Sequence, residues 1–163
     1  MTVRAFTPSE MEALQREEFI AFVTKGGEVN PATLPELVDS AIFLLTLHDG
    51  PILVGTAAIK MPFELHRLGE FRKAKAESNA HLFPLELGWV VVHPEYRCKG
   101  NGRKLVARAI EVAGHQGIYA TTKSDSMRRM LAEVGFSAEG NAYPSALDPR
   151  QYLSLFVCSP SKL

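Results

Sequence analysis

The stretch that decides the fold runs from Leu85 to Lys104 and reads LELGWVVV, HPEY and RCKGNGRK. Its first eight residues, Leu85–Val92, are all apolar or glycine except Glu86, and valines fill the last three positions. A short apolar run rich in β-branched residues is typical of a strand buried on both faces. We therefore expect a central buried strand that carries one carboxylate near its start.

A glycine turn follows this strand and leads into a helix. Pro94 ends the strand, and Gly100 and Gly102 let the backbone turn tightly before a helical apolar pattern starts at Leu105. Unpaired N–H groups converge at a helix start and the helix dipole adds positive charge, so the turn predicts a site for a phosphate group. Cations there oppose the dipole unless an anion offsets them. The cations are Arg97, Lys99, Arg103 and Lys104.

The strand, its proline and the spacing Arg97-x-x-Gly100-x-Gly102 together resemble the acyl-CoA motif of the GNAT family of N-acetyltransferases. The resemblance implies that acetyl-CoA is the cosubstrate, that turn amides hold its pyrophosphate, and that the strand end pairs with the pantetheine arm. Cys98 and Asn101 replace the glycine and the isoleucine or valine most often seen there. The implied cofactor-binding residues are Val90, Val91, Val92, Arg97, Cys98, Lys99, Gly100, Asn101, Gly102, Arg103 and Lys104.

Length, composition and net charge limit the classes of protein to which the chain can belong. The chain has 163 residues, 46% of them hydrophobic, with 18 basic and 18 acidic side chains. We expect one domain over residues 1–163, and the zero net charge argues against nucleic-acid or membrane-surface partners. There is no leader-like or membrane-spanning apolar segment, so a cytoplasmic protein is expected. Two distant cysteines and five scattered histidines predict no metal site.

Before the central strand, turn residues and helix-cap residues mark where the expected strands and helices begin and end. We expect strands over residues 2–6, 41–47 and 52–61, and helical pieces over 8–27 and 30–38. The first helix should begin at Pro8, after a capping box of Thr7 and Glu10, and should end in a left-handed cap at Gly26-Gly27. The mixed charge of Phe63–Ala80 favours a solvated helix and loop over a flap beside an acceptor site.

After the glycine turn, helices and strands are again expected to follow one another along the chain. We expect helices over residues 105–114 and 124–135, and strands over 117–122, 136–143 and 151–158. Right-handed crossover should place strand 117–122 parallel to Leu85–Val92. The fold class is therefore α/β (α+β), a mixed, mostly antiparallel sheet flanked by helices. By resemblance it is a GNAT-like fold, splayed between the two central parallel strands.

The helix that starts at Ser124 resembles the second cofactor segment of the same family. The resemblance gives Ser124 and Met127 as cofactor-binding residues. The tyrosine that often serves as general acid in the family is replaced by Leu131. Tyr96 or Tyr143 could supply that acid instead.

Glu86 is the candidate catalytic residue. It lies eleven residues before Arg97, where some members of the family carry a catalytic glutamate. Alkyl amines are mostly protonated at neutral pH, so acetyl transfer needs a proton acceptor. Strand alternation would put Glu86, Gly88, Val90 and Val92 on one face. The resemblance implies that a strand N–H near Val90 binds the thioester oxygen. A structural carboxylate bonded to a neighbouring loop is the alternative for Glu86.

The resemblance thus implies an enzyme, an N-acetyltransferase that moves an acetyl group from acetyl-CoA to a primary amine of an acceptor by direct attack. The missing tyrosine favours an alternative, a non-catalytic acyl-CoA binding or sensing domain. A small-nucleotide binder could also use the glycine turn. A nucleoside-triphosphate loop is less favoured still, because Gly102 is followed by Arg103 and Lys104 without a hydroxyl residue for magnesium.

Overall fold

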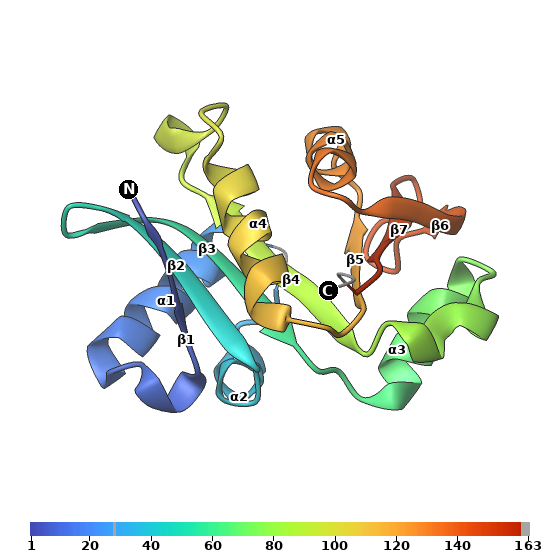
Figure 1. Ribbon diagram of the computed structural model, residues 1–163, viewed down its shortest axis with the longest axis horizontal. Helices are drawn as coiled ribbons and strands as arrows, with labels where there is room; N and C mark the ends of the chain where they lie inside the picture. Colours follow the sequence, from blue (N-terminus) through green and yellow to red (C-terminus); the bar gives the residue numbers. More distant parts are fainter. Residues whose placement is uncertain (28, 161–163) are drawn as a thin grey trace. The chain divides into compact units, whose positions relative to one another are not determined.

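The computed structural model describes residues 1–27 and 29–160. Its strands form a seven-stranded sheet in the order β1-β2-β3-β4-β5-β7-β6 (Figure 1). The strands are β1 (Val3–Phe6), β2 (Phe43–Asp49), β3 (Ile52–Lys60), β4 (Leu85–Val92), β5 (Ile118–Thr122), β6 (Ser137–Pro144) and β7 (Tyr152–Cys158). The α-helices are α1 (Ala13–Gly26), α2 (Leu34–Asp39), α3 (Glu64–Lys73), α4 (Asn101–Ala113) and α5 (Asp125–Glu133). The 3-10 helices are Pro8–Glu10, Glu77–Leu82 and Pro94–Tyr96.

The strand pairing confirms the mixed, mostly antiparallel architecture. The pairs β1–β2, β2–β3, β5–β7 and β6–β7 are antiparallel. The pair β4–β5 is parallel, with Leu85 opposite Ile118 and Glu86 opposite Tyr119. The predicted separation of β4 and β5 beyond these residues stays a prediction.

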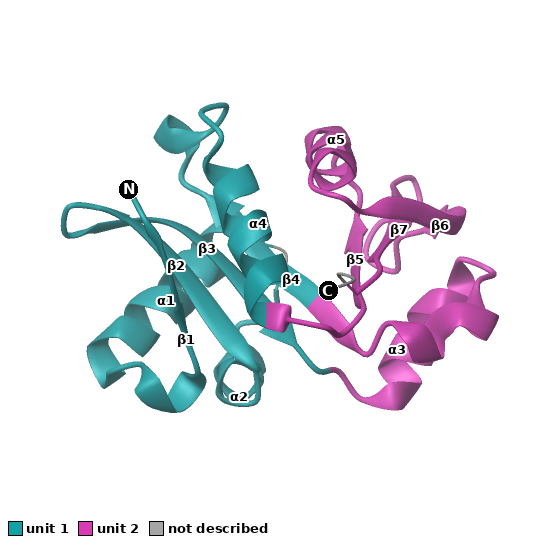
Figure 2. Ribbon diagram, viewed as in Figure 1, with its two compact units in different colours: residues 1–61, 87–112 teal, residues 62–86, 113–163 magenta. Residues whose placement is uncertain are grey.

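The chain divides into two compact units (Figure 2). Unit 1 contains residues 1–61 and 87–112, and unit 2 contains residues 62–86 and 113–163. Strand β4 therefore contributes Leu85 and Glu86 to unit 2 and its remaining residues to unit 1. The expectation of one domain over the whole chain stays a prediction.

Unit 1 is a layered structure with helices on both faces of β1–β3 (Figure 1). One face packs against α1 and α2 through a buried apolar cluster that includes Phe19, Leu34 and Ala58. On the other face, α4 lies against β3, where a Cβ on Gly55 would come within 2.8 Å of Leu105 Cδ1. Residues 55 and 58 of a strand point to opposite faces, which is why the helices cover both sides.

Unit 2 builds its core on α3 and the strands β5, β6 and β7. Phe71 of α3 is fully buried and packs edge-on against the ring of Tyr119, with 5.4 Å between the centroids. Burying one phenylalanine side chain stabilises the fold by about 1.5–3 kcal/mol. The expectation that Phe63–Ala80 is a solvated excursion was therefore wrong, because Phe71, Ala74 and Ala80 are fully buried.

Three other local predictions need correction. The Thr7–Glu10 capping box is present, but it starts a 3-10 turn, and α1 begins only at Ala13 because Met11 is extended. Gly27, at φ −130°, is also extended, so α1 has no left-handed cap there. Strand β4 was expected to be buried on both faces, but only Leu85 and Leu87 are buried and its other residues are partly exposed.

Candidate functional site

The glycine turn, residues 97–102, has two residues in left-handed backbone conformations. Cys98 has φ +59° and Gly100 has φ +80°. Side chains other than glycine pay about 1–2 kcal/mol for this conformation, which explains why glycine is common at the Cys98 position in the resembling family. A Cβ built on Gly100 would meet no atom within 4 Å, so open space borders the backbone there. The turn therefore offers main chain to a ligand without a covering side chain.

Helix α4 begins inside the glycine turn, earlier than predicted. It starts at Asn101, and the N–H of Lys104 donates to the carbonyl of Gly100 at 3.1 Å. The N–H groups of the helix residues before Lys104 have no helical carbonyl to bind, because a helix leaves its first donors unpaired. These N–H groups and the positive end of the helix dipole are suited to an anion.

Two of the predicted cations stabilise the turn itself. Arg97 Nε donates to the carbonyl of Val92 at 2.9 Å, and Lys99 Nζ donates to the carbonyl of Glu95 at 2.9 Å. The Val92 carbonyl, predicted to pair with a pantetheine arm, is thus already bound by a side chain. Through these hydrogen bonds, Arg97 and Lys99 hold the backbone around the turn in place.

The buried hydrogen bond of Asn101 explains why a polar residue stands where the resembling family usually has isoleucine or valine. Its side chain is buried, and its Nδ2 donates to the carbonyl of Tyr96 at 2.9 Å. The hydroxyl of Tyr96 in turn donates to Asp49 Oδ2 at 2.6 Å, which raises the pKa of Tyr96. The turn is therefore connected, through Tyr96, to the last residue of β2.

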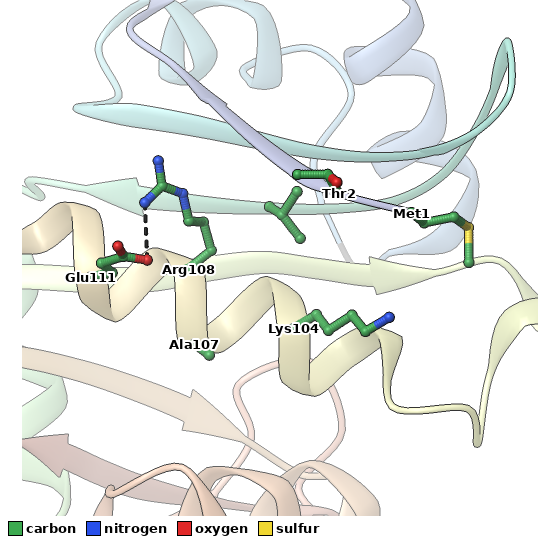
Figure 3. Close-up of a pocket in the computed structure, with 7 residues that line it drawn as sticks. Met1, Thr2, Lys104, Ala107, Arg108 and Glu111 are labelled. Atoms are coloured by element: carbon green, nitrogen blue, oxygen red, sulfur yellow. Dashed lines mark ion pairs between the residues drawn. The ribbon is translucent and has the colours of Figure 1, made fainter.

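Lys104, in the first turn of α4, lines a surface pocket of about 560 Å³ (Figure 3). The start of the chain and one face of α4 form this pocket. Among its charged residues, Arg108 and Glu111 bind each other at 2.9 Å. Of the predicted phosphate-binding cations, Lys104 is the one whose side chain lines this pocket.

Strand β4 is irregular at Trp89, which has φ +50°. The carbonyl of Trp89 accepts a hydrogen bond from Thr56 Oγ1 at 2.9 Å. A left-handed residue interrupts strand alternation, so the alternation that was expected to place Val90 and Val92 on the face of Glu86 and Gly88 does not continue across Trp89. A Cβ on Gly88 would lie 2.6 Å from Lys60 Cε, so the space beside Gly88 belongs to the Lys60 side chain.

In unit 2, Glu86 belongs to a group of side chains that we call the carboxylate cluster: His66, Arg67, Glu70, Glu86, Tyr119 and Tyr143. Tyr119 donates its hydroxyl to Glu86 Oε2 at 2.7 Å. His66 Nε2 lies 3.7 Å from the same oxygen. Burial and the negative charge of Glu86 raise the pKa of Tyr119, so its phenol stays protonated near neutral pH.

The second carboxylate of the cluster is Glu70, which accepts a hydrogen bond from the hydroxyl of Tyr143. Lys73 Nζ lies 3.3 Å from Glu70 Oε1. Burial and this hydrogen bond raise the pKa of Tyr143. Both tyrosines suggested as replacement acids, Tyr96 and Tyr143, therefore donate to carboxylates.

Helix α3 brings three members of the cluster together. His66, Arg67 and Glu70 are spaced three or four residues apart or adjacent, so they lie near each other on the helix surface. Arg67 Nε is buried without a hydrogen-bond partner. Its positive charge lies near Tyr119, whose pKa it lowers slightly against the stronger raising effects.

The predicted second cofactor segment lies at the start of α5 in unit 2. Ser124 is the N-cap, and its Oγ accepts from the N–H of Met127 at 3.3 Å. Leu131, at the family's tyrosine position, is fully buried in the core. A cofactor role for Ser124 and Met127 stays a prediction.

Sequence reasoning found Glu86 but missed its partners. His66, Glu70 and Tyr119 carry no short-range motif, because their contacts depend on packing between α3, β4 and β5. The helical spacing of His66, Arg67 and Glu70 was the one signal available, since it places three polar side chains close together.

In residues 1–27 and 29–160, no three His, Cys, Asp or Glu side chains are grouped to hold a metal ion. No helix in this described part is long and apolar enough to cross a membrane.

Comparison with known proteins gives one family match and many structural neighbours. Residues 7–136 match the family described as acetyltransferase (GNAT) family. An acyl-CoA N-acyltransferase from Pseudomonas aeruginosa is similar with a TM-score of 0.71 and 13% identity, over 96% of this chain and 98% of that chain. An aminoglycoside 6'-N-acetyltransferase complexed with coenzyme A has a TM-score of 0.69 and 13% identity, over 100% and 99%.

A third neighbour is yncA from Salmonella typhimurium, solved with its cofactor acetyl-CoA. Its TM-score is 0.66 at 16% identity, over 100% of this chain and 95% of that chain. A search among curated proteins gave no match. At such identities the structural likeness describes the fold alone.

Proposed function

The chain belongs to the acetyltransferase (GNAT) family, and from this premise we propose that it is an N-acetyltransferase. It transfers an acetyl group from acetyl-CoA to a primary amine of an acceptor by direct attack. The observation that carries the proposal is the glycine turn, where left-handed Cys98 and Gly100 lead straight into the unpaired amides of α4. This arrangement suits a pyrophosphate, which needs several N–H donors and little side-chain bulk.

Acetyl-CoA supplies the acetyl group as a thioester. The turn residues 97–102 and the first residues of α4 hold its pyrophosphate, and β4 residues Val90–Val92 lie beside the pantetheine arm. Ser124 and Met127 form a second cofactor segment at the start of α5. Open space beside Gly100 supports this fit, because a Cβ there would meet nothing in the protein itself.

Glu86 takes the proton that the amine must lose. Its side chain is 14% exposed, so it is largely shielded from water but still accessible from one side. The hydrogen bond from Tyr119 restricts the rotamer of Glu86 and orients the carboxylate. Tyr119 is itself fully buried, and we assign it an orienting role.

Ligand binding tests the cofactor assignment. We expect acetyl-CoA and coenzyme A to stabilise the fold by about 2.7 kcal/mol at a hundredfold excess over the dissociation constant. ATP is the matched control for a small-nucleotide binder, because it shares the adenosine and phosphates but lacks the pantetheine arm. A melting temperature unmoved by millimolar acetyl-CoA would reject the assignment.

A non-catalytic acyl-CoA binding domain is the second candidate, favoured by one observation. Leu131 stands where the family often has its acid, and a leucine side chain has no proton to donate. Turnover on a panel of amines, with free thiol followed as the product, separates the two candidates. Binding of acetyl-CoA without thiol release on any amine would support the binding domain.

A further inference from the structure

We propose that His66 is a proton relay, which carries the proton taken up by Glu86 out to solvent. The proposal rests on the proposed acetyl transfer and extends it to a residue outside the strand. The carrying observation is the position of His66 Nε2, 3.7 Å from Glu86 Oε2. The distance is longer than a hydrogen bond, and a small rotation of the exposed His66 side chain closes it.

Exposure explains why Glu86 needs a relay. The Glu86 side chain is 14% exposed, whereas the His66 side chain is 57% exposed. A carboxylate that has taken a proton must release it before the next turnover, and the more exposed His66 imidazole offers that proton a path to bulk water. A neutral imidazole accepts a proton at one ring nitrogen and can release a proton from the other, so the exposed His66 side chain is suited to this exchange.

The other groups around this pair do not compete for the proton. Tyr119 on β5 and Tyr143 on β6 have raised pKa values and stay protonated, so near neutral pH they act as donors only. Arg67 is a permanent cation on α3. Glu70 on α3 already accepts from Tyr143 and has Lys73 beside it. Among the described members of the carboxylate cluster, His66 is an exposed proton acceptor beside Glu86 Oε2.

The proton balance is simple. The protonated amine first gives one proton to the Glu86 carboxylate, and the neutral nitrogen then forms the bond to the acetyl carbon. As the carbon–sulfur bond breaks, the departing thiolate takes the second proton from this nitrogen, so the products are the amide and the free thiol. Glu86 then passes the proton to neutral His66 Nε2, which becomes an imidazolium. The imidazolium releases one of its two protons to water, and Glu86 returns to its charged form.

The test compares His66→Ala with the parent at several pH values. Alanine is the best helix former, so α3 should stay intact. We expect turnover at neutral pH to fall roughly 10- to 100-fold, less than the roughly 10²–10⁴-fold of a group that acts directly on the substrate, because water can still exchange with Glu86 slowly. Added imidazole should restore most of the loss. Calorimetry should show unchanged affinity for coenzyme A, a readout independent of activity.

Two controls separate a relay from an ordinary ion pair. His81→Ala makes the same change at an exposed histidine of unit 2 in the 3-10 helix Glu77–Leu82, and it should keep parental turnover. In a Glu86→Gln background, His66→Ala should cause no further loss, because the relay then has no proton to carry. Parental turnover of His66→Ala at every pH, or a loss that imidazole does not restore, overturns the relay. Parent protein that releases no thiol on any amine overturns the proposed function instead.

Discussion

In the glycine turn of unit 1 the groups available for chemistry are main-chain N–H groups, whereas in the carboxylate cluster of unit 2 they are the ends of side chains. The turn is held by contacts between residues close in sequence, such as Asn101 to Tyr96, five positions apart. The cluster joins Tyr119 to Glu86 over 33 positions and Tyr143 to Glu70 over 73. A backbone site depends on φ and ψ, and a side-chain site depends on packing.

This difference predicts opposite responses to substitution. Conservative changes that keep shape but alter one functional group should be severe in the cluster. In the turn the same kind of change should be mild, because the backbone stays in place. The three variants below test this contrast in order of decreasing effect.

The largest effect is expected for Glu86→Gln, which keeps the shape of the side chain and removes the base. Turnover at neutral pH should fall by roughly 10²–10⁴ while the affinity for acetyl-CoA changes little. The loss should shrink as pH rises, since alkaline solution supplies unprotonated amine. A pH–rate profile checks this. Parental turnover across the whole pH range would make Glu86 a structural carboxylate.

A smaller effect is expected for Tyr119→Phe, which removes the hydroxyl that donates to Glu86. The carboxylate loses a partner in a largely buried site, so the free energy of unfolding should fall by about 1–2 kcal/mol at neutral pH. The pKa of Tyr119 is raised on folding, so its stabilising contribution is complete below pH ~10 and is lost as pH rises through the folded pKa. Denaturant unfolding should therefore show a smaller alkaline loss in Tyr119→Phe.

Tyr152→Phe is the matched control, since Tyr152 is an exposed tyrosine of unit 2. It removes the same hydroxyl outside the cluster and should leave the neutral-pH stability within about 0.5 kcal/mol of the parent. Equal losses in the two variants would show that the Tyr119 hydroxyl has no special partner.

The smallest effect is expected for Cys98→Gly in the glycine turn. Glycine relieves the cost of φ +59° but adds freedom to the unfolded chain, so the net gain in stability should be at most about 1 kcal/mol. Coenzyme A affinity should stay within about twofold, because the backbone keeps its path. Cys98→Ser, with the same backbone cost, should match the parent in thermal melting and calorimetry. A large loss of affinity in both variants would show that the thiol itself contacts the ligand.

The same contrast explains which parts of the fold and of the candidate site could be predicted from the sequence. The strands, the glycine turn and the approximate positions of α4 and α5 follow from local patterns of apolar residues, prolines and glycines. Phe71 was misjudged because charged neighbours on α3 masked its burial, and the irregularity at Trp89 leaves no sequence signal. His66 and Tyr119 reach Glu86 only through packing, which no spacing in the sequence encodes.

The division into two units has a consequence for synthesis on the ribosome. Each unit combines two separated stretches of the chain, since residues 62–86 of unit 2 lie between the two parts of unit 1. All residues of unit 1 exist once Val112 has emerged, whereas unit 2 must wait for β7, which pairs with both β5 and β6. Phe71 and its apolar neighbours on α3 are therefore made long before the strands that cover them, and a nascent chain exposes them during that interval.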